Sequence, residues 1–408
     1  MCAPLVIVGT GLAGYTLARE WRKLDRSTPL VMISRDAAGF YSKPMLSNAL
    51  AGGKTPAALV MKSAEQMAQD LQAEIHPLTE VVALDAENRS LTLRPRGQGL
   101  EGAEPGAALA GPPSGLNYGR LVLALGADPI RLPLAGEAAS RVRSVNDLDD
   151  FAAFLRDIEG AQRVAILGAG LIGCEFANDL LARGIEPTVI DPAPAPLGRL
   201  LPPAAAAFLQ RRLQAAGVKF VHGASLERVE PGAGNALDLL LTDASRLQVD
   251  ALLSAVGLRP RVELARAAGL MTARGILTDR LLQTTAEGVY AVGDALEIQD
   301  GAQGHVLPFV MPLMQQARAL ASTLAGTPTP VVYPAMPVTV KTPACPTVVC
   351  PPAAALTVSW SGEEDEQGAG FTALAHDAQG ALQGFALLGS ATSRKQELAR
   401  TLPPMMGG

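Results

Sequence analysis

The sequence predicts an α/β protein that contains two similar βαβ units and ends in a small α+β domain. Two observations predict the units. A short apolar run leads into a Gly-rich turn at residues 4–14, and the same arrangement returns at residues 163–173. Each turn continues into helix-forming sequence and a second apolar run, which is typical of parallel strands buried on both faces. A third observation predicts the last domain: after a Pro-rich stretch at 334–352, strand-like runs follow at 356–360 and 381–388.

Each βαβ unit can be followed along the chain as a strand, a Gly-rich turn, a helix and a second strand. The expected elements are strand 4–8, helix 15–24 and strand 30–33, then strand 163–167, helix 174–183 and strand 188–190. The first glycine of such a turn permits the bend, the second lets the backbone approach a pyrophosphate, and the third lets the helix pack closely. The helix N–H groups and dipole then meet the phosphates. One GxGxxG match is weak evidence, but two in this context predict two Rossmann-like dinucleotide-binding domains.

The residues of the two turns are the candidate nucleotide contacts. They are Gly9, Thr10, Gly11, Leu12, Ala13 and Gly14 in the first turn, and Gly168, Gly170, Leu171, Ile172 and Gly173 in the second.

The residues after each unit differ in charge. The last strand of the second unit ends at Asp191, whose carboxylate can accept hydrogen bonds from a ribose diol and would repel a 2′-phosphate. This favours NAD over NADP. Arg199 is the only nearby cation, and Pro-rich sequence separates it from Asp191. The first unit ends instead in Ser34 and Arg35, so its ribose contact is less defined. Arg35 alone also fits a solvated turn residue.

Composition and charge narrow the class of protein. The chain has 408 residues, 48% of them hydrophobic, and a net charge of −5, which suits two or three packed domains and argues against a general nucleic-acid binder. Four scattered cysteines do not make a disulfide scaffold, and four unclustered histidines predict no metal site. We see no signal peptide and no uninterrupted apolar stretch of about 18 residues. We therefore expect a cytoplasmic protein that binds neither nucleic acid nor membrane.

A Gly/Ala/Pro-rich stretch at 97–115 separates strand-like runs at 91–93 and 121–125. We expect an expanded, mobile hairpin loop there, without a functional role.

A third motif, Thr284 to Asp294, resembles the second FAD fingerprint of the pyridine-nucleotide flavoprotein reductases. Segments 123–127 and 254–260 are similar to the two crossovers between the domains of that family, and all four motifs follow the family's order. The resemblance implies FAD at the first Gly-rich turn and NAD at the second. The insert at 97–115 is not expected in the family. The implied division is an FAD-binding domain at 1–128 and 259–330, an NAD-binding domain at 129–258, and a C-terminal domain at 331–408.

Within this family, the match narrows to the rubredoxin–NAD reductases. The segments that resemble them are 41–47, 173–179, 310–314 and 338–343. The flavorubredoxin reductases are close relatives with a similar plan. The resemblance implies an enzyme that passes electrons from NADH through FAD, one at a time, to rubredoxin.

The resemblance also implies roles for individual residues. Lys43 would sit beside the flavin and stabilise its reduced ring, and Glu175 would hold Lys43 in place, so these two are the candidate catalytic residues. Taken alone, Lys43 also fits a surface turn lysine, and Glu175 a first-turn helix acid favoured by the dipole. The remaining contacts are Val81 at adenine, Asp294 at the ribityl chain, Val310 at the pyrimidine end, Lys341 from the C-terminal domain, and the crossover glycines Gly126 and Gly257.

The cysteines bear on the electron acceptor. Disulfide reductases of the same fold carry a Cys-x4-Cys pair where this chain has Ser42 and Ser47. Cys345 and Cys350 show that spacing within a Pro-rich segment, so we expect buried structural thiols, with a dithiol relay as the alternative. Without a second redox centre, the chain should pass electrons to another protein or a diffusible oxidant. Besides rubredoxin, the alternatives are flavorubredoxin or ferredoxin, oxygen or peroxide in an NADH oxidase, and a non-catalytic FAD-binding scaffold.

Overall fold

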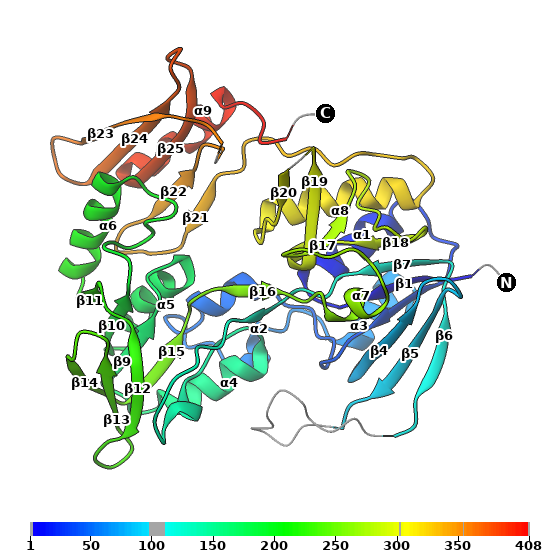
Figure 1. The fold of residues 1–408 in the computed structure, drawn as a ribbon, viewed down its shortest axis with the longest axis horizontal. Coiled ribbons are helices and arrows are strands. Elements are labelled where there is room, and N and C mark those ends of the chain that lie inside the picture. Colours follow the sequence, from blue (N-terminus) through cyan, green and yellow to red (C-terminus); the bar gives the residue numbers. More distant parts are fainter. Residues whose placement is uncertain (1–2, 98–110, 302, 354, 407–408) are drawn as a thin grey trace.

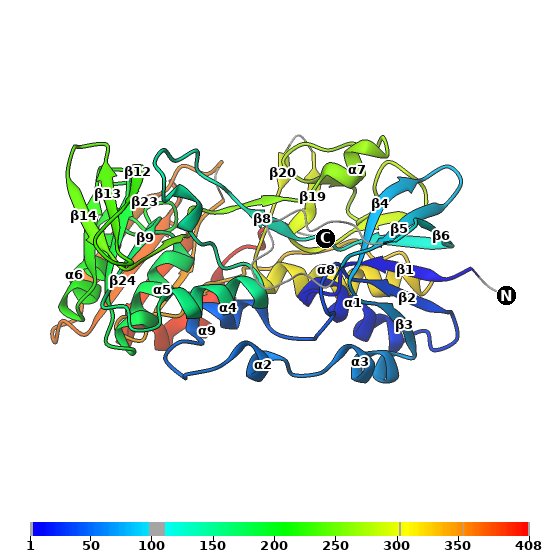
Figure 2. The ribbon, with the colours of Figure 1, turned by 90° about the horizontal axis from the view of Figure 1, so that it is seen from below.

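The computed structural model describes residues 3–97, 111–301, 303–353 and 355–406. It shows two α/β halves side by side, with a β-rich C-terminal part packed beside the second half (Figures 1 and 2).

A five-stranded parallel sheet with the order β18-β7-β1-β2-β3 forms the centre of the first half. Its strands are β1 (Leu5–Val8), β2 (Leu30–Ile33), β3 (Ala73–His76), β7 (Arg120–Leu123) and β18 (Val289–Ala291), and its helices are α1 (Leu12–Arg22), α3 (Ala64–Leu71) and α8 (Val310–Leu324). Strand β18 and helix α8 come from far along the chain, so the sequence of the second half is inserted between β7 and β18 of this sheet.

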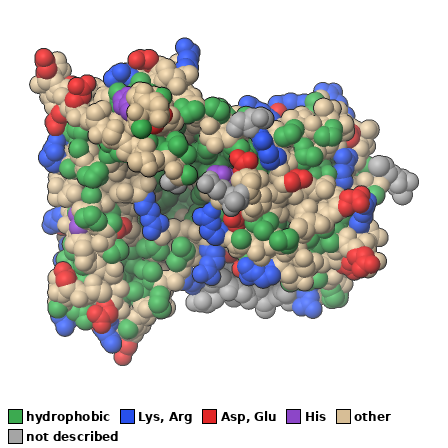
Figure 3. All heavy atoms as spheres, turned by 45° about the horizontal axis from the view of Figure 1, so that its top comes forward, with side chains coloured by type: hydrophobic (Ala, Val, Ile, Leu, Met, Phe, Trp, Pro, Cys, Tyr) green, Lys and Arg blue, Asp and Glu red, His purple; other side chains and the backbone are tan. Residues whose placement is uncertain are grey.

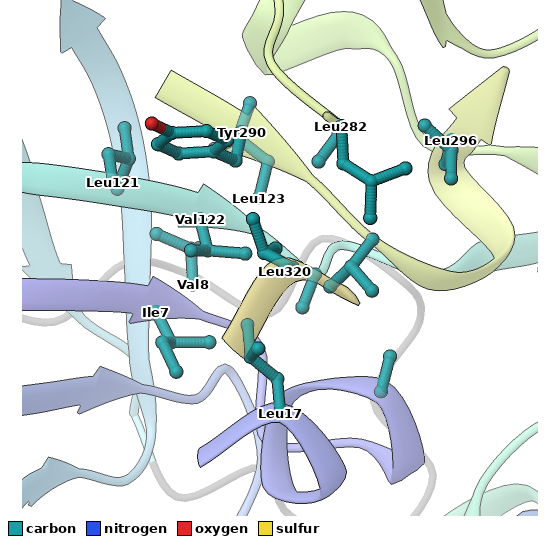
Figure 4. Close-up of a cluster of buried hydrophobic side chains, with 14 of the residues drawn as sticks. Ile7, Val8, Leu17, Leu121, Val122, Leu123, Leu282, Tyr290, Leu296 and Leu320 are labelled. Carbon is teal, nitrogen blue, oxygen red and sulfur yellow. The ribbon is translucent and has the colours of Figure 1, made fainter. Parts of the chain in front are cut away.

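The core of the first half explains the continuous apolar runs of its strands. Ile7 on β1 and Val122 on β7 are completely buried, and Leu17 of α1 and Leu320 of α8 pack against the same sheet (Figure 4). A strand covered on both faces has no solvent-facing side, so it shows no polar alternation.

The second half repeats this plan with a four-stranded parallel sheet in the order β11-β10-β9-β15. Its strands are β9 (Arg163–Leu167), β10 (Glu186–Asp191), β11 (Lys219–His222) and β15 (Ala251–Ser254), and its helices are α4 (Leu148–Asp157), α5 (Leu171–Leu181) and α6 (Pro203–Ala215). The predicted α/β class and both βαβ units are therefore confirmed.

Both helices after the Gly-rich turns begin three residues earlier than expected. Helix α1 starts at Leu12 with Gly11 as its N-cap, and α5 starts at Leu171 with Gly170 as its N-cap. The last residues of each glycine motif thus already form the first helical turn, which directs its free N–H groups out of the end of the helix.

Smaller antiparallel sheets surround the two halves. They are β4 (Thr79–Asp85), β5 (Ser90–Pro95) and β6 (Ser114–Asn117); β12 (Leu226–Pro231), β13 (Leu237–Leu241) and β14 (Arg246–Val249); and the crossover pair β8 (Ala127–Pro129) and β16 (Leu258–Pro260). A mixed sheet joins β17 (Ile276–Thr278), β19 (Leu296–Asp300) and β20 (Gln303–His305). The short helices are η1 (Lys43–Asn48), α2 (Pro56–Leu59), η2 (Ala139–Arg141), α7 (Glu263–Ala267), η3 (Gly293–Ala295) and η4 (Ser390–Arg394).

The hairpin predicted around residues 97–115 has a different partner strand. Strand β5 pairs with β6, with Leu93 opposite Ser114, whereas β7 belongs to the parallel sheet. Gly115 consequently lies in a strand rather than in the loop. Residues 98–110 of that predicted loop lie outside the described residues.

The C-terminal part is an antiparallel sheet in the order β21-β22-β25-β24-β23, followed by a helix. The elements are β21 (Val338–Val340), β22 (Thr347–Cys350), β23 (Ser359–Glu364), β24 (Gly370–His376), β25 (Leu382–Gly389) and α9 (Lys395–Thr401). The strand expected from Leu356 begins only at Ser359, because Leu356 lies in an exposed turn. Phe371 of β24 packs on Phe208 of α6 with ring centroids 5.6 Å apart, so this sheet shares a core with the second half.

Candidate active site

A cavity of about 930 Å³ lies where the two halves and the C-terminal sheet meet, a volume suited to a large cofactor. On the face shown in Figure 3, hydrophobic side chains border a hollow near the middle, with lysine and arginine side chains beside it. Most predicted site residues line the cavity: Gly9, Thr10, Gly11, Leu12, Ala13, Ser34, Arg35, Lys43, Val81, Gly126, Leu171, Ile172, Glu175, Gly257, Asp294, Val310 and Lys341. The structure places Gly14, Gly168, Gly170, Gly173 and Asp191 outside its lining.

The three glycines of the first turn are required for different structural reasons. A Cβ on Gly9 would lie 2.2 Å from the carbonyl oxygen of Ala124, and one on Gly14 would lie 1.9 Å from that of Gly9. A Cβ on Gly11 would meet nothing within 4 Å. Packing therefore requires Gly9 and Gly14, whereas Gly11 leaves open space at the N-terminus of α1. Open space beside free helix N–H groups fits the pyrophosphate of a dinucleotide.

The second turn repeats this geometry. A Cβ on Gly168 would approach the Ala255 carbonyl oxygen to 2.7 Å, one on Gly173 would approach the Gly168 oxygen to 1.9 Å, and Gly170 is open. Asp191 accepts hydrogen bonds from the N–H groups of Ala169, at 2.6 Å, and Ala193, at 2.7 Å. The carboxylate thus braces the turn in addition to standing at the end of β10.

A hydroxyl–carboxylate chain lies at the end of β2. Thr10 Oγ1 donates to Ser34 Oγ at 2.5 Å, and Ser34 Oγ donates to Asp36 Oδ1 at 2.6 Å. Asp36 also lines the cavity. The carboxylate expected at the end of the strand is therefore supplied by Asp36, two residues beyond Ser34. Sequence reasoning did not propose Asp36 as a site residue, because it lies beyond the strand end. Arg35 pairs with Asp128 at 3.5 Å.

Lys43 lies at the first residue of η1 and donates to Asn146 Oδ1 at 2.5 Å. Burial lowers the pKa of the Lys43 ammonium, and the charge of Asp294 opposes that shift. Burial likewise raises the pKa of Asp294, while Lys43 and Arg261 counteract it. Neither Asn146 nor Arg261 belongs to a motif, so sequence reasoning missed both.

The charge partner of Glu175 is Lys341 rather than Lys43. Glu175 is completely buried; its Oε2 lies 3.0 Å from Lys341 Nζ and accepts from Ser47 Oγ at 2.5 Å. Its Oε1 accepts from the Lys341 backbone N–H at 2.8 Å. We call Glu175, Ser47 and Lys341 the Glu175 clasp. The expected Lys43–Glu175 pairing is therefore wrong in this structure. Lys43 donates to Asn146 instead, and Lys341 of the C-terminal part provides the ammonium that pairs with Glu175.

The Glu175 clasp joins three parts of the chain. Lys341 Nζ also donates to the carbonyl of Pro44, and Asn48 Nδ2 donates to the Lys341 carbonyl at 3.0 Å. One helical turn further along α5, Asp179 accepts from the N–H of Leu50 at 2.7 Å. One face of α5 thus holds η1 of the first half and β21 of the C-terminal sheet at the cavity.

The other predicted residues line the cavity through backbone or apolar groups. Gly126 and Gly257, next to the crossover strands, have φ values of +71° and +119°, which L side chains rarely adopt. Val81 lies on β4 and is nearly buried, and Val310 is the half-exposed first residue of α8.

None of the described cysteines lines the cavity. Cys174, Cys345 and Cys350 are buried free thiols, and Cys2 lies outside the described residues. Burial raises the pKa of Cys350 to about 11 and also raises that of Cys345. Cys345 and Cys350 pack in different hydrophobic clusters. Within the described ranges, no group of His, Cys, Asp and Glu side chains could hold a metal ion, and no helix is long and apolar enough to cross a membrane.

Comparison with known proteins identifies the family. Residues 3–320 match the pyridine nucleotide-disulphide oxidoreductase family, and residues 330–402 match the rubredoxin binding C-terminal domain. Rubredoxin-NAD(+) reductases of Alcanivorax borkumensis and Acinetobacter baylyi are 46% and 47% identical, over 99% and 98% of this chain and 99% and 97% of theirs. The nitric oxide reductase FlRd-NAD(+) reductase of Aeromonas hydrophila is 35% identical, over 98% of this chain and 96% of its own.

A solved structure shows the same architecture. The ferredoxin reductase of Rhodopseudomonas palustris superposes with a TM-score of 0.84 at 25% identity, covering 98% of this chain and 95% of that one. The fold and cavity thus define an FAD-dependent oxidoreductase that uses NAD(H). The chain belongs to the pyridine nucleotide-disulphide oxidoreductase family, in the branch that carries a rubredoxin binding C-terminal domain.

Proposed function

We propose that this protein is an NADH-dependent reductase that delivers electrons from NADH, through FAD, to rubredoxin. The observation that carries the proposal is the cavity itself, because residues of the rubredoxin binding segment, Thr339, Lys341 and Lys395, line the same space as the first Gly-rich turn. Full-length similarity to two rubredoxin-NAD(+) reductases supports the choice of carrier.

FAD, when bound, can accept a hydride and release its electrons singly. The chain supplies the surroundings for that chemistry. The first Gly-rich turn and α1 would hold the pyrophosphate, and Asp294 would contact the ribityl chain. Val81 would lie at adenine and Val310 at the pyrimidine end. Ser34, Arg35, Gly126 and Gly257 form the remaining wall.

Two cations provide the electrostatics of the site. Lys43, held by Asn146, offers positive charge from the first half. Lys341 offers it from the C-terminal sheet, fixed by the completely buried Glu175. Fixed charges of this kind favour developing negative charge without reorganisation. The second Gly-rich turn and Asp191 bind NADH and disfavour the 2′-phosphate of NADPH.

This proposal includes the domain division at 1–128 with 259–330, 129–258 and 331–408. It also includes a cytoplasmic location. Three buried, unpaired thiols at Cys174, Cys345 and Cys350 suit a reducing compartment.

A flavorubredoxin reductase is the second candidate. The 35% identity to an FlRd-NAD(+) reductase supports it. The higher identity to rubredoxin-NAD(+) reductases makes rubredoxin the first choice. An NADH oxidase would need a reactive thiol at the cavity, where this chain has Ser47.

Steady-state NADH oxidation with a panel of acceptors tests the proposal. Purified protein should contain one FAD per chain, and rubredoxin should support a higher kcat/KM than flavorubredoxin, ferredoxin or oxygen. The proposal fails if the correctly folded protein takes up no FAD. It also fails if another acceptor in the panel exceeds rubredoxin.

A further inference from the structure

A buried hydrogen-bond relay lies beneath the FAD motifs of the first half. Gln316, on α8, is 2% exposed; its Oε1 accepts from the N–H of Gly293 at 2.8 Å, and its Nε2 donates to Tyr333 Oη at 2.9 Å. Gly293 immediately precedes Asp294, whose side chain lines the cavity. We call Gly293, Gln316 and Tyr333 the Gln316 relay.

The position of Gly293 explains why its N–H needs this partner. Gly293 has φ +80°, and a Cβ there would lie 2.7 Å from Cβ of Ala13 in the first Gly-rich turn. The turn at Gly293 is therefore pressed between the N-terminus of α1 and the side of α8. A buried backbone N–H without a partner costs free energy comparable to a lost hydrogen bond. Gln316 satisfies that N–H and at the same time fixes the direction of the peptide that leads into Asp294.

Tyr333 is held in turn by the C-terminal segment. Its N–H donates to the Met406 carbonyl at 2.9 Å, and the N–H of Met406 donates back to the Tyr333 carbonyl at 3.0 Å. The Tyr333 side chain is 1% exposed. Burial raises its pKa to about 12, so the hydroxyl stays neutral and keeps its acceptor lone pair for Gln316. The amide of Gln316 consequently has one orientation that satisfies both partners.

We propose that Gln316 is a positioning residue for FAD: it holds the Gly293–Asp294 turn in the conformation that the cofactor requires, and Tyr333 orients Gln316. The inference rests on the proposed FAD site and deepens it. In the absence of cofactor, the turn borders an open cavity, so a small shift would let water satisfy the Gly293 N–H. FAD fills that space, and from then on the N–H depends on Gln316. Loss of Gln316 should therefore weaken cofactor retention more than it weakens the fold.

The test uses the holoenzyme and three single variants. Gln316→Met keeps the size of the side chain but removes both hydrogen bonds, Tyr333→Phe removes only the acceptor hydroxyl, and Gln315→Met changes the half-buried neighbour on the same helix. The rate of FAD release after dilution is followed by the rise in free flavin fluorescence. The unfolding midpoint is measured separately by circular dichroism in excess FAD.

We expect Gln316→Met to speed FAD release by about tenfold or more, since the buried Gly293 N–H then has no partner in the FAD-bound state. Tyr333→Phe should speed it by roughly threefold, and Gln315→Met should not change it. The Gln316→Met/Tyr333→Phe double variant should release FAD no faster than Gln316→Met alone, because Tyr333 acts through Gln316.

Several outcomes would overturn the inference. One is a Gln316→Met holoenzyme that releases FAD at the wild-type rate while its unfolding midpoint falls, which is the signature of a merely structural role. Equal acceleration by Gln315→Met is another. If Gln316→Met does not fold, Tyr333→Phe decides, and an unchanged release rate there contradicts the relay. A wild-type protein that binds no FAD would instead remove the proposed function.

Discussion

Glu175 is the residue at which the three parts of the molecule meet. It is the fifth residue of α5, so it lies just beyond the first turn rather than in it, as the later helix start expected from the sequence had implied. It is completely buried and binds both the ammonium and the backbone N–H of Lys341. A buried carboxylate needs this many partners because an unpaired buried charge is strongly destabilising. Its role therefore depends on side chains 128 and 166 residues away in the sequence, at Ser47 and Lys341.

Replacement of Glu175 by Gln tests the Glu175 clasp. The amide keeps the size but removes the charge that holds Lys341 at the cavity, so we expect NADH to reduce the flavin about tenfold more slowly, or ~1.4 kcal/mol in barrier. Stopped-flow bleaching of the flavin measures this. Glu186→Gln is the matched control, because Glu186 pairs with Lys219 at 2.7 Å on the exposed surface. A Glu175→Gln enzyme as fast as the control would show that the clasp is only structural.

Asp191 performs two tasks, and its replacement should separate them. Asp191→Ala removes the charge facing a 2′-phosphate, so the ratio of kcat/KM for NADPH to that for NADH should rise by about tenfold or more. The efficiency with NADH itself should fall, because Ala169 and Ala193 lose their acceptors. Asp250→Asn is the control, since Asp250 accepts from the Gln162 and Arg163 N–H groups away from the turn. An unchanged ratio would mean that Asp191 does not face the ribose.

At the scale of elements, local sequence patterns predicted the features that depend on neighbouring residues alone. Apolar runs and Gly-rich turns predicted the βαβ units, because buried strands and tight turns leave short-range patterns. The partner of β5 was predicted wrongly, because the residues of a strand do not specify which of two similar strands will pair with it. The pairing of Glu175 with Lys341 was missed for the same reason: which side chains converge depends on how the C-terminal sheet packs against α5.

Alanine substitutions at Gly11 and Gly14 can separate two roles of the first Gly-rich turn: access for the pyrophosphate and close packing of α1. In Gly11→Ala the new methyl meets nothing within 4 Å, so the unfolding free energy of FAD-free protein should change by less than about 0.5 kcal/mol. FAD content should nevertheless fall, because the methyl occupies the approach of the pyrophosphate. Gly14→Ala should instead destabilise the protein by at least about 1–3 kcal/mol, since its methyl would lie 1.9 Å from a backbone oxygen. Equal flavin content in Gly11→Ala and wild type would contradict the assigned approach.

The thiols around β22 should be dispensable for electron transfer. Cys345 and Cys350 face different cores and burial disfavours their thiolates, so replacing both with Ser should leave NADH-driven rubredoxin reduction within about twofold. Some stability should be lost, because buried hydroxyls need partners. Turnover per bound flavin is the measurement. A large loss at unchanged flavin content would revive a dithiol relay.

At the scale of the whole molecule, the cavity is formed only when distant parts of the chain assemble. Its wall combines the carboxyl ends of the first sheet, the first turns of α5, and β21 with α9 of the C-terminal part. The motifs predicted the first two contributions. For the third, the family resemblance implied Lys341 from the C-terminal domain, and Lys341 does line the cavity. Lys395 was not predicted, because its position depends on how the C-terminal sheet packs on α6.

The charge distribution of the assembled molecule leads to the last prediction, which concerns salt. The chain has a net charge of −5, so an acidic carrier is not attracted to it as a whole. Attraction depends instead on cations at the cavity: Lys43, Lys341, which is 33% exposed, and the partly exposed Lys395, which donates to Thr339 Oγ1. Complementary charge mainly accelerates encounter, and salt screens it over a Debye length of about 8 Å at physiological ionic strength. A transient interface below about 1,200 Å² is sufficient for electron transfer.

Rubredoxin turnover should therefore fall as salt is raised from low to physiological concentration, while NADH reduction of the bound flavin, measured alone, should change much less. Lys395→Gln should flatten the salt dependence of turnover without altering flavin reduction, because Lys395 is a partly exposed residue of the cavity lining and lies outside the Glu175 clasp. Lys219→Gln, which removes a surface charge paired with Glu186 on the far strands of the second sheet, serves as the control. If turnover stays flat or rises with salt in the wild-type enzyme, docking depends on apolar contact, and the half-exposed Val310 and Met311 at the start of α8 become the surface to change next, since they border the same cavity.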